Sequence, residues 1–199
     1  MNHDTAVFDR FFETSDDPWQ FRTRWYEQRK RAVTLAALPD RRYRNAFEPG
    51  CANGELAAAL AERCDRLLAS DGSATAVKLA RDRLAPFDHV RVEQAAMPDD
   101  WPDGRFDLIV VSELAYYLPP DALRLFIERC TGSLADGGTV LACHWRRPIE
   151  GCLMSGDDVH AVFRSIGGWP GLAHHEEADF VLDVWSDDAR SVARREGFA

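Results

Sequence analysis

A short glycine-containing turn, EPGCANG at residues 48–54, holds the first side chains whose types and spacing could bind a ligand. Gly50 and Gly54 stand four residues apart, between a stretch typical of a strand and one typical of a helix. Glycine lets the backbone approach a ligand closely, and the Glu48 carboxylate suits a ligand that carries an ammonium group. The G-x-G-x-x-G pattern of dinucleotide enzymes is not present, because Ala52 occupies part of that frame.

Asp71 is the next residue whose position is informative. It follows Gly50 by 21 residues and ends a short apolar stretch that is typical of a second strand. A carboxylate at this place can accept hydrogen bonds from both hydroxyls of a ribose. The alternative is that Asp71 caps the next helix, although Ser73 is the better candidate for that cap. The turn and Asp71 together predict a nucleoside-containing ligand.

Polar and aromatic side chains also follow two later expected strands. Ser112 and Glu113 end or follow the apolar run FDLIVVS, Tyr116 and Tyr117 come next, and His144 ends a further strand. A ring and a carboxylate suit a cationic ligand through cation–π and Coulomb attraction. We expect one tyrosine to pack and the other to face the site; simple packing under the next helix is the alternative for the pair. His144 is expected to act as a base, to orient the acceptor, or to be a hydrogen-bonded structural residue.

These side chains need a framework of strands and helices. Helical spacing over residues 20–38 predicts a first helix, capped by Asp16 or Asp17 with Pro18 in its first turn. The alternation that follows predicts a doubly wound α/β sheet, in which ligands lie beyond the carboxyl ends of the strands. We expect strands at 44–48, 66–70, 90–94, 106–112 and 139–144, helices at 53–63, 74–84, 121–134 and 157–166, and extended stretches at 172–176 and 180–185.

Length and composition exclude several classes of protein. The 199 residues fit one domain, with 46% hydrophobic and 29% charged residues. A formal charge of −9 disfavours nucleic-acid binding. No apolar run approaches the roughly 18 residues of a membrane span, and no secretory signal is recognisable, so we expect a cytoplasmic protein. The five cysteines include no C-x-x-C pair and are expected to be small buried groups, with no metal site.

Three segments resemble motifs of class I S-adenosylmethionine-dependent methyltransferases: EPGCANG, LLASDGS and FDLIVVSELAYYL. More narrowly, DPW near the start, CANG in the turn and SELAYYL resemble the nodulation protein S (NodS) family of N-methyltransferases. The resemblance covers residues 15–145. It implies a single-domain, Rossmann-like, doubly wound sheet of about seven mostly parallel strands. Residues 1–38 would form an N-terminal helical lid segment and residues 39–199 the methyltransferase domain.

The resemblance also implies a cofactor, S-adenosylmethionine (SAM), which becomes S-adenosylhomocysteine (SAH). Many class I enzymes have an aspartate near position 96 for the adenine amino group; Ala96 stands here, so backbone groups and Met97 would have to serve. Arg29 would meet the methionine carboxylate or be a surface charge. The residues implied around the cofactor are Glu48, Gly50, Cys51 and Gly54 near the methionine, Asp71, Gly72 and Ser73 near the adenosine, Ala96 and Met97 at the adenine, Ser112 and Glu113 along the cofactor, and Trp19, Tyr26 and Arg29 in the lid.

Methyl transfer requires an acceptor lone pair aligned with the activated methyl group, with water kept out. An amine must be neutral when it attacks, so its proton would pass to water, to Glu113 or His144, or to a tyrosinate of Tyr116 or Tyr117. In the nodulation family the acceptor is the freed amino group of a glucosamine that ends a chitin oligosaccharide, so the resemblance implies a small amine-bearing substrate. The alternatives are an O-methyltransferase, a nicotinamide or nucleotide-sugar oxidoreductase, a non-catalytic cofactor-binding module and an RNA methyltransferase.

Overall fold

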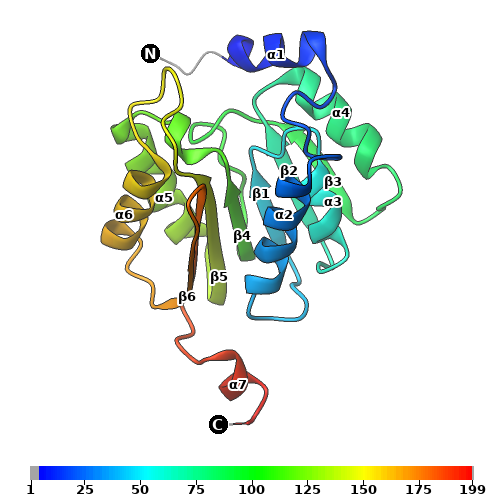
Figure 1. Cartoon of the computed structure of the whole chain (residues 1–199). Helices are drawn as coiled ribbons and strands as arrows, with labels where there is room; N and C mark the ends of the chain where they lie inside the picture. Colours follow the sequence, from blue (N-terminus) through cyan, green and yellow to red (C-terminus); the bar gives the residue numbers. More distant parts are fainter. Residues whose placement is uncertain (1–4, 199) are drawn as a thin grey trace.

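The computed structural model describes residues 5–198, with side chains from residue 8 onward, and arranges them around one sheet (Figure 1). The strands are β1 (Ala46–Pro49), β2 (Leu67–Asp71), β3 (Val90–Gln94), β4 (Phe106–Ser112), β5 (Leu134–Trp145), β6 (Gly171–Glu176) and β7 (Phe180–Ser186). Their order across the sheet is β3-β2-β1-β4-β5-β7-β6, with β7 antiparallel to both neighbours and the other pairs parallel. The predicted single sheet of mostly parallel strands in an α/β fold is confirmed.

Helices cover both faces of the sheet (Figure 1). One face carries α2 (Trp25–Ala37), α3 (Glu55–Ala61) and α4 (Ala74–Leu84), and the other carries α5 (Pro120–Ser133) and α6 (Gly156–Ile166). Helix α1 (Thr5–Thr14) lies against α4, and a short 3-10 helix (Ala115–Tyr117) follows β4. This two-sided arrangement is the doubly wound architecture that the strand–helix alternation predicts.

Strand β4 shows why the sheet has two separate cores. Leu108 and Val110 belong to the cluster under α3 and α4, whereas Ile109 and Val111 belong to the cluster under α5 and α6. Side chains alternate between the faces of a strand, so a strand covered on both faces reads as a continuous apolar run. All four side chains are fully buried, and the strand therefore holds the residues at its end in fixed positions.

The N-terminal segment differs from the prediction of a single helix over 20–38. Two helices, α1 and α2, form instead, and the first had not been predicted. The carboxylate of Asp17 does not cap a helix over 20–38; it accepts hydrogen bonds from the backbone N–H groups of Phe21 at 2.8 Å and Arg22 at 3.0 Å, which closes a turn. Gln20 has a φ of +61°, a conformation incompatible with a continuous helix. Helix α2 therefore begins only at Trp25.

Other boundaries follow the predictions with small differences. Helix α4 and strands β3 and β4 have the predicted bounds. Helix α3 begins at Glu55 and not at 53, because Gly54 takes a left-handed φ of +82° at its N-terminus. Strand β5 begins earlier than predicted, because Leu134 already pairs with Phe106 of β4 before the regular pairing that starts at Thr139.

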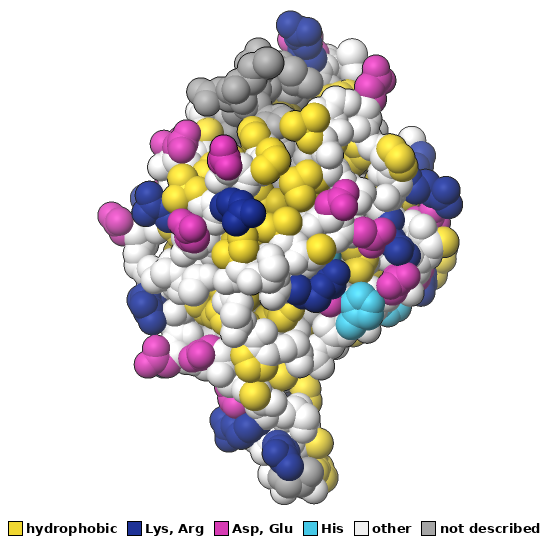
Figure 2. Space-filling view, turned by 90° about the vertical axis from the view of Figure 1, so that its left-hand side faces the viewer, with side chains coloured by type: hydrophobic (Ala, Val, Ile, Leu, Met, Phe, Trp, Pro, Cys, Tyr) yellow, Lys and Arg dark blue, Asp and Glu magenta, His cyan; other side chains and the backbone are white. Residues whose placement is uncertain are grey.

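A short C-terminal helix, α7 (Val192–Arg195), lies in a segment that projects from the molecule, below the sheet in Figures 1 and 2. On the face seen in Figure 2, apolar side chains gather in the upper half, with acidic and basic side chains interspersed among them. Within residues 5–198, none of the helices combines the length and the apolar character that crossing a bilayer would require.

Candidate active site

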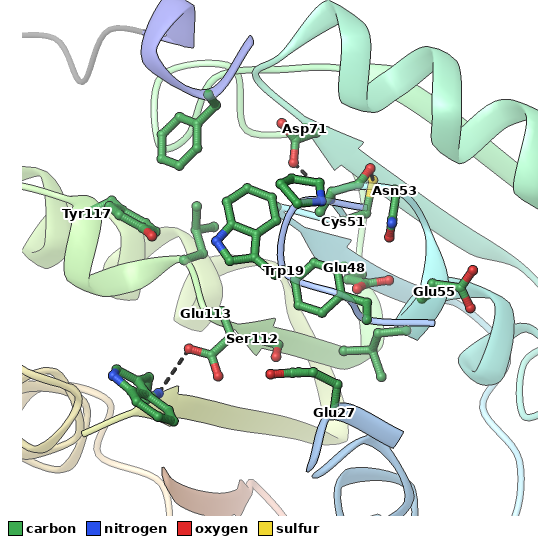
Figure 3. A pocket seen from close by; sticks show the side chains of 18 of the residues that line it. Trp19, Glu27, Glu48, Cys51, Asn53, Glu55, Asp71, Ser112, Glu113 and Tyr117 are labelled. Carbon is green, nitrogen blue, oxygen red and sulfur yellow. Dashed lines mark hydrogen bonds between the residues drawn. The ribbon is translucent and has the colours of Figure 1, made fainter. Parts of the chain in front are cut away.

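A cavity of about 590 Å³ opens at the carboxyl ends of β1 and β4, which lie side by side at the centre of the sheet (Figure 3). The chain winds outward in opposite directions from these two strands, so this is the switch point at which open α/β sheets bind ligands. The cavity has the size of an ordinary small-molecule site. Of the predicted site residues, those that line it are Trp19, Tyr26, Glu48, Gly50, Cys51, Asp71, Gly72, Ser73, Ala96, Met97, Ser112, Glu113, Tyr116 and Tyr117.

Two glycines fix the turn after β1, but for different reasons. Gly50 has a φ of +74° and lines the cavity, and its N–H donates to the carbonyl of Ser70 at 2.7 Å. Gly54 does not line the cavity, which corrects its assignment to the cofactor. A Cβ at Gly54 would stand 3.1 Å from the Cα of Ala80 in α4, so this glycine permits the close packing of α3 on α4.

Glu48 is a buried carboxylate with unused hydrogen-bonding capacity. The residue is 2% exposed, and its Oε2 has no hydrogen-bond partner among the residues described. Burial raises the pKa of Glu48 to about 8, with a smaller contribution from the nearby carboxylate of Asp71. Buried polar atoms in proteins are nearly always paired, so an orphaned oxygen at a cavity wall fits a missing cationic partner. The ammonium group of SAM has the required charge and donors.

Asp71 ends β2 and orders the backbone around the cavity. Its Oδ2 accepts the N–H of Ala52 and its Oδ1 accepts that of Ser73, both at 2.9 Å. The cap of α4 is Ser73, whose hydroxyl accepts the N–H of Ala76 at 3.1 Å. Burial raises the pKa of Asp71 above its ordinary value, and these backbone donors offset part of that shift. Carboxylate oxygens have several lone pairs, so Asp71 keeps acceptor capacity for ribose hydroxyls.

The adenine end of the expected site has fewer free donors than the sequence implies. Ala96 and Met97 line the cavity as predicted. The N–H of Ala96, however, already donates to the carboxylate of Asp100 at 2.9 Å. A backbone contact from Ala96 to adenine is thus restricted to the second lone pair of its carbonyl, which already accepts the N–H of Asp100 at 2.9 Å, and the Met97 side chain supplies apolar contact.

Glu113 stands at the other end of the cavity, directly after β4, with a φ of +55°. Its carboxylate accepts hydrogen bonds from Nζ of Lys30 at 2.6 Å, from the backbone N–H of Trp145 at 2.9 Å and from the hydroxyl of Tyr116. A left-handed backbone at a non-glycine residue is uncommon and requires support from its surroundings. These three donors provide that support and leave Glu113 well satisfied.

Both tyrosines after β4 border the cavity, which corrects the expectation that only one would face it. Tyr116 is buried and Tyr117 is half-buried, with ring centroids 4.8 Å apart in an edge-to-face arrangement. Burial raises the pKa of Tyr117 to about 12, and it also raises the pKa of Tyr116 well above its ordinary value. Both phenols are therefore protonated near neutral pH, and neither is a tyrosinate base.

His144 lies outside the cavity, so it does not contact an acceptor. The ring is fully buried; Nε2 lies 3.2 Å from the N–H of Ala115, and Nδ1 lies 3.0 Å from Nε2 of His160. His160 Nδ1 in turn lies 2.6 Å from the carboxylate of Asp183. Burial lowers the pKa of His144 far below its ordinary value. His144 supports the 3-10 turn after Glu113, and the prediction of a base at this position is wrong.

Ala115, His144, His160 and Asp183 form a series of hydrogen bonds. The direction of each bond follows from the groups at the two ends of the series, the N–H of Ala115 and the carboxylate of Asp183. An amide N–H can only donate, so His144 Nε2 accepts from Ala115 and the ring proton sits on Nδ1. That proton is donated to His160 Nε2, so the proton of His160 sits on its Nδ1, facing Asp183. With both rings as neutral Nδ1–H tautomers, every ring nitrogen of His144 and His160 has a hydrogen-bond partner.

Two residues of the predicted lid face in different directions. Arg29 lies outside the cavity and pairs with Glu177 at 2.7 Å, which is the surface-charge alternative rather than a contact to the methionine carboxylate. Trp19 projects toward the middle of the cavity (Figure 3), in a cluster with Phe11, Phe12 and Phe21.

The sequence did not identify Lys30 and Glu27, which face the cavity from α2. Lys30 is 6% exposed, and its Nζ lies 3.0 Å from Glu27 and 2.6 Å from Glu113. Burial alone would lower the pKa of Lys30, but the two carboxylates outweigh it and raise that pKa. The i,i+3 spacing of a glutamate and a lysine on a predicted helix was the available signal. A basic helix typically exposes its lysines, and that pattern pointed away from the site.

The family of this chain follows from comparison with known proteins. A profile of the family "Nodulation protein S (NodS)" matches residues 6–161, well over half of the sequence. This chain belongs to the nodulation protein S family. The Nodulation protein S of Rhizobium tropici is 32% identical over 126 residues, which are 62% of this chain and 53% of that protein. The chain thus spans about half the length of the curated relatives it matches.

Solved structures that share the fold of this chain include a member of this family. An N-methyltransferase NodS from Bradyrhizobium japonicum WM9, in complex with SAH, superposes with a TM-score of 0.83 at 23% identity, over 94% of this chain and 98% of that one. A candidate methyltransferase from Pseudomonas syringae is 53% identical, with a TM-score of 0.74, over 82% of this chain and 99% of that one. The resemblance seen in the sequence motifs is confirmed.

Proposed function

We propose that this protein is a SAM-dependent methyltransferase that methylates the amine nitrogen of a small molecule, an amino sugar or its oligosaccharide. The observation that carries the proposal is the orphaned carboxylate oxygen of Glu48 at the switch-point cavity, with Asp71 beside it. These two carboxylates match the ammonium and ribose hydroxyls of SAM. Membership of the nodulation protein S family, and an SAH-bound N-methyltransferase of the same fold, support the same cofactor.

Different residues of this protein would bind the cofactor and the acceptor, at the two ends of the cavity. Bound SAM supplies a methyl carbon activated by a positively charged sulfur. Glu48 and Asp71 hold and orient the cofactor, while Trp19 and the other aromatic residues of the N-terminal segment exclude water. Tyr116 and Glu113 line the opposite end, where an acceptor would meet a ring face and negative charge.

An amine is the acceptor that this end of the cavity favours. Glu27 and Glu113 share one paired cation, Lys30, while Arg24, the other cation near Glu27, forms no ion pair with either carboxylate. A poorly solvated negative charge is stabilised by a cationic ligand. Amino sugars carry an ammonium group near neutral pH, and hydroxyls and phenols do not.

Calorimetric titration with SAH tests the cofactor assignment. Asp71→Asn removes the charge but keeps the shape, and it should weaken SAH binding tenfold or more, because a hydrogen bond to a charged group contributes roughly 1.5–3 kcal/mol. Asp82→Asn is the matched control, since Asp82 is a highly exposed residue of α4. Unchanged binding in Asp71→Asn would remove the ribose role, and no SAH binding by the unmodified protein would overturn the proposed function.

A further inference from the structure

Five groups near the acceptor end of the cavity could take a proton from an amine, and four of them are occupied or protonated already. His144 is buried behind the cavity wall and is bonded to Ala115 and His160. The phenols of Tyr116 and Tyr117 keep their protons near neutral pH. Glu113 accepts three hydrogen bonds, from Lys30, Trp145 and Tyr116. The fifth group is the carboxylate of Glu27.

Glu27 differs from Glu113 in what surrounds it. Its side chain is 12% exposed and lines the cavity, and among the described residues only Lys30 forms an ion pair or hydrogen bond with its carboxylate, at 3.0 Å. A carboxylate has about four lone-pair positions, so most of its acceptor capacity is unused. Figure 3 shows Glu27 and Glu113 on either side of Ser112, at one end of the cavity, with Asp71 at the other end. Glu27 thus has free acceptor sites at the end of the cavity away from Asp71, where the proposed function places the acceptor.

We propose that Glu27 binds the ammonium group of the acceptor and removes its proton, whereas Lys30 and Glu113 act as positioning residues. This inference rests on the proposed function and assigns a base to it. The charged groups that face Glu27 are Lys30 and Arg24 from its own helical segment and Glu113 from the turn after β4. Burial raises the pKa of Glu27 above its ordinary value, and the two cations offset part of that shift. A carboxylate with a raised pKa is a better proton acceptor than an ordinary one.

The acceptor enters as an ammonium ion, and one N–H proton moves to a carboxylate oxygen of Glu27. The freed nitrogen lone pair forms a bond to the methyl carbon of SAM while the bond between that carbon and sulfur breaks, and its electron pair stays on the sulfur of SAH. The product leaves as a methylated ammonium ion, and Glu27 returns its proton to water.

Glu27→Gln tests this assignment because glutamine keeps the size of the side chain but cannot hold the proton. We expect SAH affinity to stay within about threefold, and kcat/KM for a free-amine glucosamine disaccharide to fall about 100-fold at pH 7. Without its base, the variant depends on amine that is already neutral in solution. Its deficit should therefore shrink as the pH rises toward the pKa of the amine. Glu27→Asp should retain the pH profile of the unmodified protein, and Glu62→Gln, at an exposed position after α3, is the matched control.

The outcomes separate this inference from the proposed function. A loss in Glu27→Gln that is equally large at every pH, or no loss at all, would overturn the role of Glu27 while amine methylation stands. Methyl transfer by the unmodified protein to hydroxyls alone would overturn the proposed function, and the inference with it. Binding gives a second readout without turnover: with SAH bound, Glu27→Gln should bind the disaccharide about tenfold more weakly, and equal affinity would contradict the proposal.

Discussion

Lys30 Nζ lies 2.6 Å from the carboxylate of Glu113, and this ion pair joins helix α2 to the turn after β4 across the cavity. Lys30 is 6% exposed, so the pair is well shielded from water. The N-terminal segment is therefore tied to the acceptor end of the cavity, while its aromatic residues cover the centre. Occupation of the cavity and ordering of this segment should be coupled.

This coupling predicts that residues 15–38 behave as a lid. Addition of SAH should slow amide hydrogen exchange in this segment, because Trp19 and Tyr26 gain a ligand to pack against. Hydrogen exchange followed by mass spectrometry measures the effect, and Trp19→Ala should reduce it. Slower exchange at residues 50–54 without any change in 15–38 would leave the segment as a fixed cover.

Glu48 predicts a pH dependence of both stability and binding. Burial raises its pKa from 4.5 to about 8, so between these values the folded protein holds a proton that the unfolded chain has released. The free energy of unfolding without ligand should therefore fall as the pH rises through this window. An ammonium group beside Glu48 favours the ionised form, so SAH binding near pH 7 should release protons.

Calorimetry in two buffers with different ionisation enthalpies measures this release. The apparent binding enthalpy of SAH should differ between the buffers, and the difference should shrink in Glu48→Gln. The same difference in both proteins would show that the proton comes from another group.

Replacement of Gly54 should lower the stability of the fold without a direct effect on SAH binding. Gly54→Ala would place a Cβ 3.1 Å from the backbone of Ala80 at a left-handed φ, which should cost roughly 1–3 kcal/mol of unfolding free energy. SAH affinity should change less than threefold. Gly151→Ala has a similar φ of +83° in open space and isolates the backbone contribution. Chemical denaturation and calorimetry on both variants provide the comparison; a large loss of affinity with unchanged stability in Gly54→Ala would contradict this account.

The hydrogen bonds of the buried residues His144 and His160 predict one particular tautomer for each ring. Nitrogen-15 NMR at pH 7.5 should show that His144 and His160 both carry their ring proton on Nδ1, because Ala115 can only donate. The half-buried ring of His89, whose Nε2 lies 2.9 Å from the carbonyl oxygen of Ala61, serves as an internal reference for a histidine outside this series of hydrogen bonds. An Nε2-protonated His144 would mean that the hydrogen bond to Ala115 is not formed in solution.

Local signals predicted part of the fold well. Helix α4 has the predicted bounds because its cap, Ser73, and its apolar spacing lie within the segment itself. Strand β4 was recognisable because both of its faces are buried. The break between α1 and α2 depends on two backbone bonds to Asp17, which apolar spacing cannot reveal.

The cofactor end of the site was more predictable than the acceptor end. Glu48 and Asp71 lie within the turn and strand that position them, so sequence order alone placed them together. His144 was misassigned because a strand-end position does not specify which face the side chain takes, and its ring meets His160 of α6. Glu27 and Lys30 reach the cavity only through the packing of α2 on the sheet, a contact between distant segments.

The function proposed for the cavity is methyl transfer from SAM to an amine. Incubation with methyl-labelled SAM and paired glucosamine oligomers, one set with a free amine and one fully N-acetylated, tests it most directly. An acetylated nitrogen is conjugated with its carbonyl and is a poor nucleophile. Label is expected on the nitrogen of the free-amine oligomers and not on the acetylated set. Label on the acetylated oligomers, or on phenols but no amine, would contradict it.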